Sequence, residues 1–111
     1  MSASDYFVNP EQCSHYEIFP GVDIHTMAGK HVMLSVVEMK PHAVVEPHHH
    51  HHEQIGVLLE GELTFTIGGE EQTLRPGQMW RIPGDVEHKA IAGPHGAKAL
   101  DVFNPVRDDY L

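Results

Sequence analysis

The sequence predicts an all-β protein, built as an antiparallel sandwich or a small barrel of short strands. Glycines and prolines recur at intervals too short for helices of ordinary length. Apolar and polar residues alternate most clearly along residues 62–67, as expected for a strand with one buried face. Gly68 and Gly69 follow directly, and two glycines between strand-like segments predict a tight hairpin turn.

The remaining predicted strands have the same character. Each is a run of about four to eight residues bounded by glycine, proline or polar side chains. In chain order they cover residues 32–39, 54–59, 70–74, 79–82, 88–92 and 97–103. Residues 1–15 show no clear pattern, and we expect them to form an arm or an edge strand.

The length of the chain bounds its organisation. With 111 residues it has room for one domain and not for a second, so we expect residues 1–111 to fold as a single domain. Cys13 is the only cysteine, which indicates a reducing compartment. No secretory signal and no run of the ~20 apolar residues needed for a membrane span is visible. A cytoplasmic protein without a membrane partner is expected.

The charge balance excludes one class of partner and leaves histidine as the unusual residue. Sixteen Asp and Glu against seven Lys and Arg give a formal charge of −9, which repels the phosphates of nucleic acid. Eleven residues are histidine, and residues 48–52 are five histidines in a row. Histidine is the commonest metal ligand in proteins, so this run is the first candidate for a functional site.

The histidine run could be an expression tag, a solvated chelating tract or a set of ligands in a folded site. Its internal position between two strand-like segments argues against a tag. Because side chains alternate between the faces of an extended strand, we expect His48, His50 and His52 to share one face. Two of these could hold one ion, with His52 near the ion or the substrate. His49 and His51 are then expected to point to solvent.

The segment PHHHHHEQIGVLLEGE resembles the first motif of the cupin family, a His-x-His pair followed by a carboxylate and then a glycine. Counting back from Gly61 places Gln54 at the carboxylate position. The same register assigns His48 and His50 to the pair and leaves Glu53 one residue out of place. The usual carboxylate ligand is therefore replaced by a neutral amide, whose oxygen can still coordinate a cation.

The segment GQMWRIPGDVEH resembles the second cupin motif. Gly77, Pro83 and His88 match it in position, whereas its middle glycine lies one residue early, at Gly84. Asp85 stands at the expected glycine, and aspartate tolerates a left-handed backbone, so we expect the turn to survive. The two motifs together imply a single-domain cupin with a double-stranded β-helix, or jelly-roll, barrel.

The resemblance implies a metal site formed by His48, His50, Gln54 and His88. Three imidazoles and an amide oxygen suit a divalent transition metal such as Zn, Ni, Mn or Fe. Positions left open for water or substrate are typical of catalytic rather than structural metals. All four ligands are neutral, so the ion would keep its charge and attract a small anionic substrate. A cupin that has lost its metal or its chemistry is the alternative.

Three further strings, HEQIG, LEGELTFTIGGE and LDVFNPVRDDYL, are similar to those of the small KdgF family of pectin and alginate degradation. The similarity extends over roughly residues 32–111. KdgF proteins are understood to convert 4,5-unsaturated monouronates, released by polysaccharide lyases, into linear ketonized sugars. The resemblance therefore implies an isomerase or tautomerase that acts on a sugar acid.

The same resemblance implies roles for three residues near the end of the chain. Asp101 would be the acid and base of the reaction, and Phe103 an apolar wall that limits water. Arg107 would bind the substrate carboxylate through its guanidinium fork. Strand parity alone leaves open which face of this segment points inward. A structural carboxylate at Asp101, and a surface pair of Arg107 with Asp108 or Asp109, are the alternatives.

Other functions remain open from the sequence. A cupin oxygenase that uses iron, another cupin lyase or cyclase, and a cupin that binds a small molecule without catalysis would all fit the same ligands. Trp80 and Met79 alternate on a predicted strand, so one is expected in the core and the other could line the pocket. Because unpaired edge strands are often covered by a second copy, and cupins commonly dimerise, we expect a homodimer.

Overall fold

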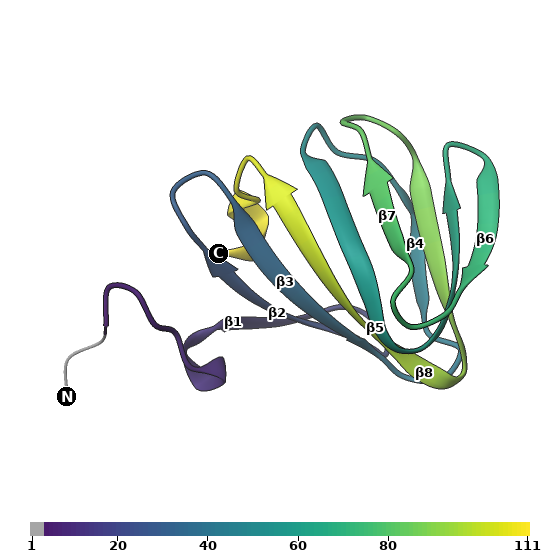
Figure 1. Ribbon diagram of the computed structural model, residues 1–111, viewed down its shortest axis with the longest axis horizontal. Helices are drawn as coiled ribbons and strands as arrows, with labels where there is room; N and C mark the ends of the chain where they lie inside the picture. Colours follow the sequence, from purple (N-terminus) through teal and green to yellow (C-terminus); the bar gives the residue numbers. More distant parts are fainter. Residues whose placement is uncertain (1–3) are drawn as a thin grey trace.

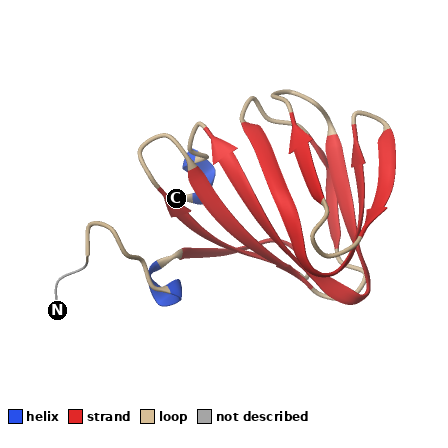
Figure 2. Ribbon diagram, in the orientation of Figure 1, coloured by secondary structure: helices blue, strands red, loops and turns tan. Residues whose placement is uncertain are grey.

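The computed structural model describes residues 4–111, and β-strands dominate this part of the chain (Figures 1 and 2). The strands are β1 (Ser14–Phe19), β2 (Val22–Ala28), β3 (Met33–Met39), β4 (Val44–His48), β5 (Glu53–Ile67), β6 (Glu70–Leu74), β7 (Met79–Ile82) and β8 (His88–Asn104). Short 3-10 helices occupy Pro10–Gln12 and Asp108–Tyr110. Each strand pairing is antiparallel, so the predicted fold class is confirmed.

Two long strands, β5 and β8, run through both walls of the barrel (Figure 1). The first half of β5 lies between β7 and the end of β8, and its second half lies between β6 and the start of β8. The sequence predicted each long strand as two shorter ones. Gly61 and Gly96, both with φ of 82°, bend the strands instead of ending them, and the β5–β8 ladder shifts register beside Gly61. The two halves can thereby belong to different walls.

The hairpin glycines behave as predicted, whereas β1, β2 and β4 were not predicted as strands. Gly68 and Gly69 connect β5 to β6 with φ of 56° and 83°, the positive angles of a mirror-image turn. β1 and β2 form a second hairpin at the edge of the sheet. Residues 4–13 precede β1 in the sequence and extend away from the barrel as an arm (Figure 1). The first three residues of the predicted arm lie outside the described residues.

The interior of the barrel is apolar except at one group of side chains. Inward-facing residues such as Val22, Ile24, Leu58 and Ile82 are fully buried and form the core. Five polar side chains are buried with them, namely Thr26, Ser35, Gln54, His88 and Asp101. Buried polar groups need partners, so this part of the interior is the place to look for a site. Within residues 4–111, no helix is long and apolar enough to cross a membrane.

One outer face of the barrel is also apolar, and it is open to solvent. Adjacent rows of outward side chains on β3, β8, β5 and β7 are Leu34, Val36, Leu100, Val102, Ile55, Val57 and Met79. Ile55, near the middle of this face, is 50% exposed. The arm begins beside the face, where Val8 helps to line a hollow of about 430 Å³. Its rings at Tyr6 and Phe7 are 88% and 81% exposed, so they make little contact with their own barrel.

We propose that a second copy of the chain covers this outer face and takes up the arm. The chain itself supplies an uncovered apolar surface and exposed aromatic rings on an arm whose Val8 lines a hollow at the border of that surface. The paired residues Ile55, Val57, Leu100 and Val102 at the centre of the face are uncharged, and the charged neighbour of Ile55 is the cation Arg81 on β7. Two copies with a charge of −9 each can therefore meet there without bringing acidic side chains together. The expected homodimer remains a prediction.

Replacing Ile55 with glutamate should convert the dimer to a monomer. A glutamate would be buried unpaired in the contact, which weakens association by roughly a hundredfold or more. Ile91→Glu is the matched control, because Ile91 is 39% exposed but faces outward from the other half of β8, opposite Val44 and Thr64. Sedimentation equilibrium measures the mass of both variants. A monomeric parent protein, or equal dimerisation of the two variants, contradicts the proposal.

Candidate metal centre

The histidine run forms a loop rather than a strand. β4 ends at His48 and β5 begins only at Glu53. The expectation that His48, His50 and His52 share one face used the alternation of a strand, which does not apply here because the chain turns between two strands. His49 and His51 are exposed, as predicted, while His50 turns toward the interior.

The second motif fixes this loop from the other side. Asp85 has φ of 66°, which confirms the left-handed position expected from the displaced glycine. Its backbone N–H donates to the carbonyl of His50 at 2.7 Å. Gly84 leaves no space for a side chain, because a β carbon there would overlap the carbonyl oxygen of His51. The turn that precedes β8 thus holds the histidine loop in place.

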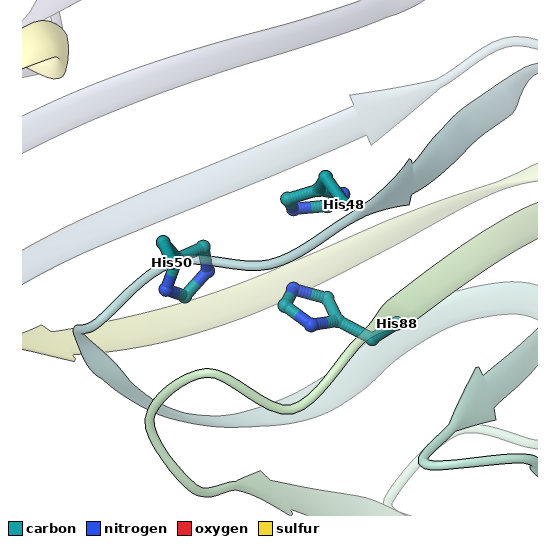
Figure 3. Close-up of side chains that lie close together, drawn as sticks. All are labelled: His48, His50 and His88. Atoms are coloured by element: carbon teal, nitrogen blue, oxygen red, sulfur yellow. The ribbon is translucent and has the colours of Figure 1, made fainter.

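Three imidazoles converge in the interior. The candidate ligand atoms of His48, His50 and His88 all lie within 4.8 Å of one another. They come from the end of β4, the loop after it and the start of β8 (Figure 3). The two sequence motifs therefore meet in space, as the predicted metal site requires.

Each of the three rings is oriented by a backbone hydrogen bond from its Nδ1. The acceptors for His48, His50 and His88 are the carbonyl oxygens of Glu46, His52 and Val86, at 2.8, 3.0 and 2.9 Å. A carbonyl oxygen can only accept, so each Nδ1 carries the proton and each Nε2 presents a lone pair. This is the arrangement in which imidazole binds a metal through Nε2.

The Nε2 lone pairs of these histidines have no hydrogen-bond donor, and a cation would bind to them. Nε2 of His88 is buried and has no hydrogen-bond partner. Nε2 of His50 lies 3.2 Å from Oε1 of Gln54. On its other side, Gln54 lowers the pKa of the Asp101 carboxyl as a hydrogen-bonding neighbour. A carboxylate accepts, so the amide N–H of Gln54 faces Asp101 and its oxygen faces His50. Two acceptors then face each other, and a divalent metal between them would satisfy both.

The protonation state of the histidines agrees with this role. Burial lowers the pKa of His48 and His88, and it lowers the pKa of His50 to about 4, with the Arg107 charge as the next cause. All three rings are therefore neutral near pH 7. Metal binding requires neutral imidazole, so no proton has to be displaced at that pH.

Gln54, and not Glu53, faces the site. Gln54 is buried, whereas Glu53 is exposed at the start of β5. This places the amide where the register from Gly61 predicted it. The metal identity is not determined by this set of ligands, because Zn, Ni, Mn and Fe all accept imidazole with an oxygen ligand.

The end of β8 turns Asp101 and Phe103 inward and leaves Leu100 and Val102 outside. The Asp101 carboxylate accepts a hydrogen bond from the indole N–H of Trp80 at 2.8 Å. Burial raises the pKa of Asp101 to about 6, against the opposing effect of its hydrogen bonds and of Arg107. The ring of Phe103 contacts the site from the side, with its centroid 5.8 Å from that of His50.

The sequence left open whether Arg107 faces the substrate site or pairs with Asp108 or Asp109, and the structure shows it at the cavity and paired with Asp109. Its side chain is largely buried and lines the same cavity as His48, His88 and Asp101. It also donates to the Asp109 carboxylate, from Nε at 3.3 Å and Nη2 at 2.9 Å. Its role toward a substrate remains a prediction.

Sequence reasoning missed Tyr110, which lines this cavity of about 60 Å³. Of Trp80 and Met79, one was expected in the core and the other at the pocket. Trp80 is the buried one, and it also lines the cavity and donates its indole N–H to Asp101. Tyr110 follows Arg107 in the tail, and its ring lies 4.0 Å from the guanidinium carbon. No spacing pattern marks Tyr110. His52, expected near the ion, is half-buried and is not one of the three converging histidines.

Known proteins resemble this chain in sequence and in fold. Its residues 35–103 match the cupin domain family. A RmlC-like cupin from Shewanella frigidimarina superimposes with a TM-score of 0.88 at 27% identity, over 100% of both chains. KdgF from Halomonas sp. superimposes with a TM-score of 0.85 at 31% identity, over 98% of this chain and 100% of that one.

A curated relative resembles part of the chain. Dimethylsulfoniopropionate lyase DddW from Ruegeria pomeroyi is 35% identical over 71 residues, which are 64% of this chain and 47% of the lyase. The match thus spans about half of the lyase's length. The family match covers both histidine motifs and the strands that carry Gln54 and Asp101. The chain therefore belongs to the cupin domain family.

Proposed function

We propose that the protein is a metal-dependent isomerase that opens 4,5-unsaturated uronates to linear keto sugars. One observation carries the proposal: a buried carboxylate, Asp101, lines the same cavity as Gln54 and two of three converging neutral imidazoles. The similarity to KdgF over almost the whole chain supports the substrate class. Conversion to a keto sugar needs no oxidant, so proton transfer and charge stabilisation are sufficient.

The four residues His48, His50, Gln54 and His88 would hold the metal. When bound, it would supply positive charge that stabilises an enolate oxygen as it forms. The imidazoles stay neutral and therefore do not reduce that charge.

The proton transfers fall to Asp101. Its carboxylate removes the proton of the anomeric hydroxyl, the C1 to ring-oxygen bond breaks, and C1 becomes an aldehyde. The ring oxygen leaves as the enolate of the C4–C5 double bond. Asp101 then returns the proton to C4, and the enolate becomes a ketone at C5. Substrate and product are isomers, because the proton taken from oxygen is the proton given to carbon.

Phe103 and Arg107 shape the remainder of the site. The ring of Phe103 is buried and limits access of water to the reacting carbons. Arg107 lies in the cavity with a guanidinium that pairs with a carboxylate in this structure, and we expect a substrate carboxylate to compete with Asp109 for it. A uronate is larger than this cavity of about 60 Å³, so side chains that line it must shift when it binds.

A second candidate is a lyase that acts on a small carboxylate. The sequence similarity to dimethylsulfoniopropionate lyase DddW favours it. The same Asp101 could remove a proton next to a carboxylate in an elimination. A cupin oxygenase remains the third class, and it alone would consume oxygen.

One assay separates these candidates. The purified protein, loaded with each of Zn, Ni, Mn and Fe in turn, is incubated with unsaturated galacturonate or mannuronate. We expect the ultraviolet absorbance of the C4–C5 double bond to disappear without oxygen uptake. Parallel reactions with dimethylsulfoniopropionate test for release of a volatile sulfide. Turnover of that compound alone, or oxygen consumption, contradicts the proposed function.

Replacing Arg107 with alanine should raise KM for the uronate by about ten- to a hundredfold, because a charged hydrogen-bonding partner of the substrate carboxylate is lost. The bound metal should be unchanged. Arg81→Ala is the control, since Arg81 is exposed on β7 and does not line the cavity. Steady-state kinetics measure both variants. An unchanged KM in Arg107→Ala would contradict the role of Arg107 in substrate binding and leave it a structural role through its contact with Asp109.

A further inference from the structure

Three residues on neighbouring strands form one row across the floor of the site. Gly56 on β5 is in register with Trp80 on β7 on one side and with Asp101 on β8 on the other. Strands two apart in a sheet are separated by roughly 9–10 Å, too far for most side chains to meet. The indole of Trp80 nevertheless donates to Oδ1 of Asp101 at 2.8 Å.

The central glycine makes this contact possible. A β carbon at Gly56 would overlap both Oδ1 of Asp101 and Nε1 of Trp80. Any other residue would therefore occupy the space in which the hydrogen bond forms. The backbone of Gly56 does not require glycine, since its φ is not positive, so the need for glycine arises from this close approach.

The bond is held from both ends. Trp80 and Asp101 are buried, and the ring of Phe65 packs against the indole with centroids 5.1 Å apart. Gln54, whose oxygen lies 3.2 Å from His50 Nε2, is a buried neighbour that lowers the pKa of Asp101. A buried carboxylate that accepts a short hydrogen bond from a packed indole has little freedom to rotate.

We propose that Trp80 is a positioning residue that holds the Asp101 carboxylate toward the cavity across Gly56. The inference rests on the proposed function insofar as Asp101 is taken to move the proton. Trp80 donates its N–H to Asp101. Loss of this bond would misplace the base, so it should lower kcat and leave KM nearly unchanged.

Trp80→Phe tests the role in catalysis. This variant keeps an aromatic ring in the core and removes only the N–H donor. We expect kcat to fall by about ten- to a hundredfold, the range for losing a hydrogen bond to a charged group, while KM changes by less than about twofold. Phe65→Leu is the control, because it disturbs the packing of the same indole but leaves its N–H. An equal loss in both variants, or an unchanged kcat in Trp80→Phe, overturns the proposal.

The hydrogen bond itself can be observed without substrate. Trp80 is the only tryptophan of the chain, so its indole N–H gives a single signal in a proton–nitrogen correlation spectrum. We expect that signal to move upfield and to exchange faster with solvent in Asp101→Ala and in Gly56→Ala. It should not move in Asp23→Ala, because Asp23 pairs with His15 at the sheet edge.

The kinetic and spectroscopic measurements distinguish failure of the proposed function from failure of the positioning role. If the protein turns over no unsaturated uronate, the proposed function falls, and the indole signal alone then decides whether Trp80 holds Asp101. If the indole signal is the same in Asp101→Ala as in the parent protein, the hydrogen bond does not exist in solution and the positioning role is excluded.

Discussion

Replacing His50 with alanine should weaken binding of the divalent metal by roughly a hundredfold or more and leave the β-fold intact. His50 contributes one of three converging lone pairs, and Gln54 Oε1 lies 3.2 Å from its Nε2. The substitution removes the ligand that connects the other two histidines to the amide. His50 lies in a loop, so no strand pairing is lost. Elemental analysis after dialysis measures the metal, and circular dichroism measures the fold.

His49→Ala is the matched control for this experiment. It removes a histidine from the same run, one residue away, whose side chain is exposed. We expect it to retain the full amount of metal. If both variants lose metal equally, the run acts as a solvated chelating tract. If His50→Ala retains full stoichiometry, the assignment of this ligand is wrong.

The sequence predicts which side chains converge better than it predicts the backbone that carries them. Gln54 and His88 could be assigned because motif spacing is local, and Asp85 could be expected to adopt a left-handed backbone from its own chemistry. Residues 49–52 form a loop, so the strand alternation used to place His48, His50 and His52 on one face does not describe them. Alternation along a sequence does not reveal where a chain must turn. His50 reaches the interior because the Asp85 N–H and Gly84 hold its loop, a contact between distant segments.

The parts that could not be predicted depend on pairing between strands. The alternation of residues along the sequence does not tell whether Asp101 and Phe103 point into the barrel or out of it. The register of β8 against β3 and β5 determines that they point inward. Trp80 lies 21 positions from Asp101 in the sequence, and the two meet only because both flank Gly56. At Gly61 and Gly96 the chain bends and continues, so that pairs of predicted short strands form single long ones. A glycine in the sequence does not tell whether a strand bends or ends there.

Replacing Asp101 with asparagine should remove turnover, by about 10²- to 10⁴-fold in kcat, and leave the metal in place. Asparagine has nearly the same shape but cannot accept and return a proton. It can accept the indole N–H of Trp80 through its oxygen, so the row across Gly56 is kept. The three imidazoles do not contact this side chain through hydrogen bonds and should still bind the ion.

Measuring metal and turnover together distinguishes an acid–base group from a structural carboxylate. If Asp101 only supports the fold, asparagine should lower the melting temperature while kcat of the folded fraction stays near that of the parent protein. If it moves the proton, kcat should fall with metal content and melting temperature nearly unchanged. Asp23→Asn, an equivalent substitution at the sheet edge, should alter neither kcat nor metal content. Since the amide N–H of Gln54 faces Asp101 and its oxygen faces His50, a loss of metal in Asp101→Asn would mean that the carboxylate acts mainly by orienting that amide.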